Sequence, residues 1–155
     1  MVFQQLFLWP HLTLSENILL PLKGKASPDR IKYYEELVDI FAIEKYLHHH
    51  PNAASLGQRQ RAALVRALLL RPDYLLLDEI TSSLDVEQIE ALIKHLRRLA
   101  AEEKTILLVT HLLGFARNVA DKVAFLGSGQ ILGFGSYDKL QSSQNPTIHS
   151  FLSLA

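Results

Sequence analysis

The sequence lacks cysteine, an excess of charge of one sign and any long apolar run. With no cysteine among 155 residues, disulfide bridges, thiolate metal ligands and thiol catalysis are excluded. The 16 basic and 16 acidic residues cancel, which argues against a nucleic-acid partner or a polybasic membrane anchor. No apolar run approaches the ~20 residues that cross a bilayer, and no secretory signal is visible. These absences favour a soluble protein of a reducing compartment without direct membrane insertion.

The sequence contains two short apolar runs separated by a segment of helical periodicity. Residues 74–77 (YLLL) end in Asp78 and Glu79, and residues 105–110 (TILLVT) end at His111. Between the runs, apolar residues keep helical spacing over about 86–103. Strand, helix and strand in this order predict a parallel crossover unit, and the unbroken runs predict strands buried on both faces. The predicted fold class is therefore α/β.

Capping and turn residues mark the remaining predicted elements. Ser27-Pro28-Asp29 predicts a helix start, with Ile31, Tyr34, Leu37, Val38 and Phe41 on its apolar face. A second helix is expected over 55–70, and a hairpin is expected around residues 127–129. Short helices over 137–141 and after residue 146 close the chain.

Asp78 and Glu79 are the first candidates for chemistry. In open α/β sheets ligands bind beyond the carboxyl ends of the strands. Two adjacent acids there suit a Mg²⁺ ligand and a base for an attacking water, while the alternative is a solvated strand end.

His111 follows the next strand, so it is expected on the same rim, where it either contacts a phosphate or has only a structural role.

Residues 55–58 (SLGQ) open a helix and allow two compatible interpretations. Ser55 and Gln58 have the spacing of a capping box, and the free amides of a helix start can also bind phosphate. Two other features are interpreted as structural. Residues 48–50 (HHH) favour a polar loop over a metal site, and Phe3, Phe7 and Trp9 favour packing over base stacking.

Taken together, the motifs resemble the ATP-binding subunit of ABC transporters. The segments that carry the resemblance are 54–61 (ASLGQRQR), 75–79 (LLLDE), 81–85 (TSSLD) and 109–111 (VTH). They match in order and spacing the family's signature, Walker B, D-loop and switch histidine. Residues 2–4 (VFQ) and 10–13 (PHLT) are similar to the family's Q-loop segment. The amino-acid sequences of that segment and of the C-terminus are most similar to those of the polar amino-acid uptake branch.

The resemblance runs from residue 2 to residue 152 and implies a partial P-loop NTPase core with a mostly parallel sheet. It implies one partial domain over 1–155, in which about 5–71 hold the Q-loop and the helical subdomain with the signature helix. About 72–155 would form the C-terminal half of the catalytic core. In the family's sheet another strand lies between the strand before His111 and the one at 123–126, so its absence is expected to favour self-association or rearrangement.

The resemblance also implies roles for individual residues. Gln4 would contact Mg²⁺ and couple the nucleotide site to the transmembrane partner. Asp78 would support Mg²⁺, Glu79 would be the general base, and His111 would hold the γ-phosphate and the attacking water. Ser55, Gly57 and Gln58 would contact ATP bound by the opposing subunit, and Asp85 would communicate across the dimer. The implied cofactors are therefore ATP and Mg²⁺.

The sequence departs from the family at several positions. Ala54 and Leu56 replace the Leu and the first Gly of the Leu-Ser-Gly-Gly-Gln signature, and Ile80 stands where the family has proline. No Gly-x-x-x-x-Gly-Lys-Ser/Thr motif occurs in the 155 residues. Because that loop normally grips the β- and γ-phosphates, the chain is expected to be N-terminally truncated, to bind ATP weakly and not to hydrolyse it alone.

The implied assembly is peripheral to a membrane. The expected partners are a transmembrane permease subunit and a second ATP-binding subunit, or a further copy of this chain. The expected location is cytoplasmic, at the inner face of the cell membrane. The alternative is a non-catalytic interaction module or gene remnant that docks on a permease or on a complete ATPase subunit.

Overall fold

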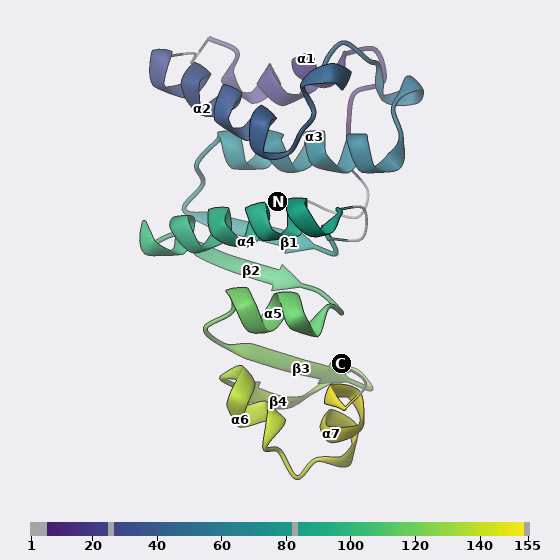
Figure 1. Cartoon of the computed structure of the whole chain (residues 1–155), viewed down its shortest axis with the longest axis vertical. Coiled ribbons are helices and arrows are strands. Elements are labelled where there is room, and N and C mark those ends of the chain that lie inside the picture. Colours follow the sequence, from purple (N-terminus) through teal and green to yellow (C-terminus); the bar gives the residue numbers. More distant parts are fainter. Residues whose placement is uncertain (1–5, 25–26, 82–83, 154–155) are drawn as a thin grey trace. The chain divides into compact units, whose positions relative to one another are not determined.

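The computed structural model describes residues 6–24, 27–81 and 84–153. The chain divides into two compact units, Met1–Val109 and Thr110–Ala155. Figure 1 shows the elements of both units. Gln4, Phe3 and the part of the D-loop at 82–83 lie outside the described residues.

Three helices form one layer of the first unit: α1 (Leu14–Leu19), α2 (Pro28–Ile40) and α3 (Leu56–Leu69). Each helix begins at a side-chain cap. Thr13 forms a capping box with α1, and Ser27 caps α2 with proline at the first helical position, as the sequence predicts. Helix α3 packs against both α1 and α2 (Figure 1). Its apolar residues are almost all buried: Ala62, Ala63, Leu64, Val65, Ala67, Leu68 and Leu69.

The second layer of this unit is the predicted strand–helix–strand motif. It comprises β1 (Tyr74–Asp78), α4 (Val86–Ala101) and β2 (Thr105–Val109). The strands pair in parallel, from Tyr74 opposite Thr105 to Asp78 opposite Val109. Helix α4 lies alongside these strands in Figure 1 and contacts β2. The predicted α/β class and the parallel pairing are therefore confirmed.

The prediction that both strands are buried on both faces is wrong. Leu75 and Leu77 are buried, whereas Tyr74 is 72% and Leu107 61% exposed. Because side chains alternate along a strand, the register places these two exposed residues on the same face of the sheet. One face of the two-stranded sheet is therefore covered within this unit, and the other is open.

The apolar face of α2 also differs from the prediction. Ile31 is exposed and Tyr34 half-buried, whereas Tyr33, Leu37 and Val38 are buried. The reason is the polar tip of Tyr33, which is turned toward α4 to form a hydrogen bond. Helical spacing alone does not distinguish the two neighbouring tyrosines.

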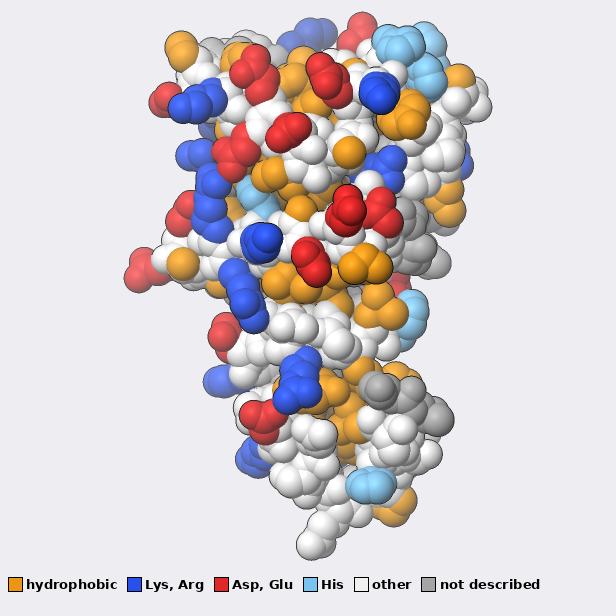
Figure 2. Space-filling view, in the orientation of Figure 1, with side chains coloured by type: hydrophobic (Ala, Val, Ile, Leu, Met, Phe, Trp, Pro, Cys, Tyr) orange, Lys and Arg blue, Asp and Glu red, His pale blue; other side chains and the backbone are white. Residues whose placement is uncertain are grey.

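The second unit contains α5 (Leu113–Val119), β3 (Val123–Gly127), β4 (Gln130–Gly135), α6 (Tyr137–Gln141) and α7 (Pro146–Leu152). The two strands form the predicted antiparallel hairpin, whose Ser128 and Gly129 have the positive φ angles typical of a tight turn. Apolar side chains also reach the surface of this unit (Figure 2). In neither unit do the described residues include a helix long and apolar enough to span a bilayer.

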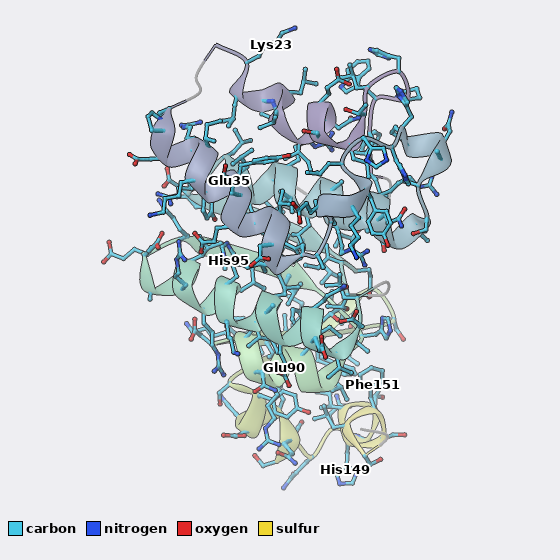
Figure 3. All side chains as sticks on the ribbon, turned by 45° about the horizontal axis from the view of Figure 1, so that its top comes forward. Lys23, Glu35, Glu90, His95, His149 and Phe151 are labelled. Atoms are coloured by element: carbon cyan, nitrogen blue, oxygen red, sulfur yellow. The ribbon has the colours of Figure 1, made fainter. Side chains whose placement is uncertain are left out.

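A buried polar contact joins α2 to α4 in the first unit. The Tyr33 hydroxyl lies 2.9 Å from Nε2 of His95, and Figure 3 shows His95 where these helices meet. The guanidinium of Arg71 lies 4.3 Å above the Tyr33 ring. At the rim, Nη1 of Arg98 lies 2.6 Å from a carboxylate oxygen of Glu36. The buried histidine and tyrosine therefore depend on each other for hydrogen bonding.

The junction makes the stability of the first unit dependent on pH. Burial, and then the positive charge of Arg98, lower the pKa of His95 below its ordinary value. The unfolded chain therefore binds more protons once the pH falls below about 6.5. The free energy of unfolding should decrease below that pH, by up to about 1.4 kcal/mol for each unit between the two pKa values. Urea unfolding at a series of pH values, followed by the fluorescence of Trp9, measures this decrease.

The matched variant is His95→Gln, which keeps a polar side chain and removes the imidazole. Its unfolding free energy should change less between pH 7 and 5 than that of the parent chain. An equal pH dependence in both proteins would show that His95 is not the titrating group.

Candidate functional site

The end of β1 carries the two acidic residues that the sequence singles out. Asp78 is the last residue of the strand and lies opposite Val109, so β1 and β2 end at the same edge of the sheet. The amide of Glu79 continues the pairing and donates to the Val109 carbonyl at 3.0 Å. Glu79 has a φ of 49°, in the left-handed region. For a residue with a side chain this conformation costs on the order of 1 kcal/mol, and such strain is concentrated at functional sites.

The residues after Glu79 turn back into the core. Ile80 and Thr81 are both buried, so the apolar side chain that replaces the family's proline is accommodated by packing. The Thr81 hydroxyl oxygen has no hydrogen-bond partner among the described residues, which stop at Thr81 and resume at Leu84. The backbone between strand and D-loop is therefore anchored by burial.

The signature segment forms the predicted capping box. The Ser55 hydroxyl oxygen accepts from the Gln58 backbone amide at 3.3 Å, and the Gln58 side-chain oxygen accepts from the Ser55 backbone amide at 2.9 Å. Gly57 is half-buried at the second helical position, whereas the Leu56 side chain is 55% exposed. A helix of this length presents free amides at its start, so the same turn is suited to a phosphate group.

Helix α4 begins in the same way, at Asp85. A carboxylate oxygen of Asp85 accepts from the Gln88 amide at 2.9 Å, and the Gln88 side-chain oxygen accepts from the Asp85 amide at 3.4 Å. That same oxygen accepts from Nη1 of Arg61, on α3, at 3.1 Å. A side chain of the signature helix therefore contacts the cap of the D-loop helix. Sequence reasoning missed this link, although Arg61 is part of the signature segment.

The aromatic residues before α1 are not packed in the core. Phe7 is 64% and Trp9 53% exposed, so the interpretation of these two residues as packing is wrong. Their backbone is held instead by polar side chains, Arg66 from α3 and Asn17 from α1. These hydrogen bonds fix the backbone of the segment, so its position does not depend on burial of the two aromatic rings.

His111 belongs to the second unit, where it is exposed. Its convergence with Asp78 and Glu79 stays a prediction, as does the role of Gln4. Among the described residues no group of three histidines and carboxylates could hold a metal ion, and the histidines at 48–50 are no exception. Two carboxylates at a strand end nevertheless fit Mg²⁺, which usually takes one or two protein carboxylates and completes its coordination with water and phosphate.

Comparisons with known proteins show the family of the chain. The family described as ABC transporter matches residues 1–82. The glutamine transport ATP-binding protein GlnQ of Escherichia coli is 40% identical over 139 residues, which cover 88% of this chain and 58% of GlnQ. The histidine/lysine/arginine/ornithine transport protein HisP of Salmonella typhimurium is 37% identical, covering 98% of this chain and 61% of HisP. The chain thus spans about three fifths of the length of these relatives.

Solved structures give the same result for the fold. The ATP-binding cassette MJ0796, in a dimeric post-hydrolysis state with ADP and Pi, matches with a TM-score of 0.76 and 32% identity. That match covers 88% of this chain and 61% of the cassette. An ATP-binding subunit of an ABC transporter matches with a TM-score of 0.81 and 27% identity, covering 94% and 64% of the two chains. The sequence and the fold together place this chain in the ABC transporter family, among the ATP-binding subunits.

Proposed function

We propose that this chain supplies the signature, catalytic-acid, D-loop and switch segments of an ATP-hydrolysing subunit of an amino-acid importer. The observation that carries the proposal is the placement of Asp78 and Glu79 at the carboxyl end of a parallel strand, in register with the end of β2. Ligands of open α/β sheets bind at this edge. The similarity to GlnQ and HisP, ATP-binding proteins of glutamine and of histidine/lysine/arginine/ornithine transport, supports the substrate class.

In this proposal Glu79 does the proton chemistry. Its carboxylate takes a proton from water as the water oxygen attacks the γ-phosphorus, while the bond to the β-phosphate oxygen breaks and ADP leaves. Asp78 would hold Mg²⁺, which when bound neutralises charge on the phosphate oxygens. His111 would donate to the γ-phosphate and orient the attacking water. The left-handed backbone at Glu79 turns the chain out of the strand at the residue that must face this water.

The signature residues would act on ATP held by a second subunit. Ser55, Gly57 and Gln58 lie at the start of α3, where helix amides and a hydroxyl suit a γ-phosphate. Asp85, at the cap of α4, would transmit the state of one site to the other. Arg61 of α3 donates to Gln88, the partner of Asp85 in the capping box. Gln4 and the exposed segment after it would meet the transmembrane permease, so that the subunit works at the inner face of the membrane.

ATP binding by this chain alone is proposed to be weak. The 155 residues contain no Gly-x-x-x-x-Gly-Lys-Ser/Thr segment, and preorganised phosphate donors are usually the largest catalytic contribution. Turnover then requires those donors from another polypeptide. The second sheet face, with Tyr74 and Leu107 exposed, is available within the first unit for such an association.

A second candidate function is a non-catalytic interaction module. The observation that favours it is Leu56, whose exposed side chain projects from the turn that should approach phosphate closely. Such a chain would dock on a permease or on a complete ATPase subunit without hydrolysing ATP. The two candidates differ in whether Glu79 matters for turnover.

The catalytic proposal predicts that Glu79→Gln abolishes ATP turnover. The assay mixes the chain with a polypeptide that carries the N-terminal half of a related ATP-binding subunit, including its Gly-x-x-x-x-Gly-Lys-Ser/Thr motif (Walker A). It measures phosphate release with Mg²⁺ present. The amide cannot accept the proton of the attacking water, so kcat should fall about 100-fold or more while ATP binding is retained. The chain assayed alone should show no turnover above background.

Glu87→Gln provides the matched control, because Glu87 is an exposed carboxylate on the first turn of α4. This variant should keep the parent turnover. Equal rates of phosphate release with Glu79→Gln and with the parent chain in the mixture would favour the interaction module. Separately, micromolar ATP affinity of the chain alone would contradict the proposed weak binding.

The signature proposal predicts that Leu56→Gly increases turnover in the same mixture. Removing the side chain lets the backbone at the start of α3 approach the partner's phosphate, and each 1.4 kcal/mol of recovered contact is worth about tenfold in kcat/KM. Leu56 is largely exposed, so little packing is lost, although glycine costs the helix up to about 1 kcal/mol.

Leu56→Ala separates crowding from backbone freedom, since alanine is small but keeps the conformational restrictions of a residue with a side chain. It should give an intermediate rate. A Leu56→Gly variant that folds normally and turns over no faster than the parent would exclude crowding by Leu56.

A further inference from the structure

One arginine of the signature helix binds the backbone at the start of the described chain. Arg66 lies on the last turn of α3, and its Nη2 donates to the Leu6 carbonyl at 2.8 Å. Its Nη1 donates to the carbonyl of Phe7, the next residue, at 2.9 Å. A single guanidinium therefore holds two consecutive peptide groups that are about 60 residues away in sequence.

The chemistry of this contact requires arginine. Arg66 is half-buried, and burial lowers the pKa of its guanidinium, which marks a partly desolvated cation. The ion pairs found among the described residues involve Arg98 and Lys104 rather than Arg66. The planar fork of a guanidinium can span two carbonyl oxygens, whereas the ammonium of lysine is a point donor. We call this contact, in which the Arg66 guanidinium binds the carbonyl oxygens of both Leu6 and Phe7, the clamp.

The same segment is also held by Asn17, a fully buried residue of α1. Its side-chain oxygen accepts from the Trp9 amide at 2.7 Å. Its side-chain nitrogen donates to the carbonyls of Trp9, Leu12 and Thr13 at 3.1, 3.1 and 2.9 Å. Both side chains bind backbone atoms, so the position of residues 6–13 is set by α1 and α3 while Phe7 and Trp9 stay exposed.

We propose that Arg66 is a positioning residue that makes the segment after Gln4 move as one body with the signature helix. Residues 6–9 directly follow the predicted Q-loop glutamine, and Ser55 caps the helix that carries Arg66. A displacement of the segment then reaches the phosphate-contacting end of α3 through the guanidinium. The inference rests on the proposed function for the roles of Gln4 and Ser55, but the clamp itself is a property of the chain alone.

Arg66→Met tests the clamp, because methionine keeps an unbranched apolar stem and removes the donors. Trp9 is the only tryptophan of the chain, so its fluorescence reports on this segment without labelling. In the variant, Trp9 anisotropy should fall, and the amides of Trp9 and Leu12 should exchange with deuterium about tenfold faster. Amides of α2 should keep the parent exchange rates, which distinguishes local release from general destabilisation.

Two further variants complete this experiment. Lys94→Met removes an exposed cation from α4 in the same unit and should change neither readout. Arg66→Lys keeps the charge but cannot span both carbonyls, so it should behave more like Arg66→Met than like the parent; it also serves as the test if the methionine variant does not fold. Parent-like anisotropy and exchange in a folded Arg66 variant would overturn the proposal.

The functional role is measured in the mixture with a Walker A polypeptide. Arg66→Met should lower kcat about tenfold with a smaller change in KM, because the clamp positions groups and does not itself bind ATP. Release of Trp9 without any change in kcat would overturn the role of the clamp in turnover. If the parent mixture and Glu79→Gln are both inactive, the proposed function fails, and the clamp is judged by the fluorescence and exchange data alone.

Discussion

The in-register parallel pairing of β1 with β2 is the constraint on which the candidate site depends. It places Asp78 opposite Val109 and lets the Glu79 amide add one more hydrogen bond before the chain leaves the sheet. A shift of one residue would exchange the two faces of β1, burying Asp78 and exposing Leu77. The burial of Leu75 and Leu77 therefore determines the strand register. The register in turn determines the position of the Asp78 and Glu79 carboxylates.

Helix α3 connects the remaining parts of the first unit. Its apolar side chains are buried, so it cannot rotate without disturbing the packing of α1 and α2. Its polar side chains reach outward to other segments, Arg61 to the cap of α4 and Arg66 to the backbone at Leu6 and Phe7. The helix that begins with the signature segment thus contacts two other segments, the D-loop helix and the residues after Gln4, that the family resemblance assigns to nucleotide handling.

Local features of the structure could be predicted from the sequence. The caps at Ser27 and Ser55 depend on residues within three positions of each other, and both are found at the predicted place. The same holds for the strand–helix–strand order and for the hairpin at 127–130. Helix α5 was missed because its seven residues carry too short a periodic pattern and no side-chain cap.

Features that depend on distant contacts could not be predicted. The buried face of α2 is decided by the hydrogen bond of Tyr33 with His95, which lies 62 residues further along the chain. The sequence contains one indication that His95 is buried, because His95 occupies an apolar position of α4 between Leu92 and Leu99. The exposure of Leu107 depends on which partners cover the sheet, and composition does not contain that information.

The same limitation applies to the aromatic residues before α1. Hydrophobic residues are more often buried than exposed, so the sequence favours packing for Phe7 and Trp9. Their exposure follows from backbone hydrogen bonds to Asn17 and Arg66, which no pattern of side-chain hydrophobicity reveals.

The division of the chain after Val109 has a consequence for biosynthesis. Both strands of the parallel sheet, the helix between them and the polar junction of α2 with α4 lie within Met1–Val109. Translation proceeds from the N-terminus, and compact units fold as they emerge from the ribosome. The edge that bears Asp78 and Glu79 can therefore form while the hairpin of the second unit is still being synthesised.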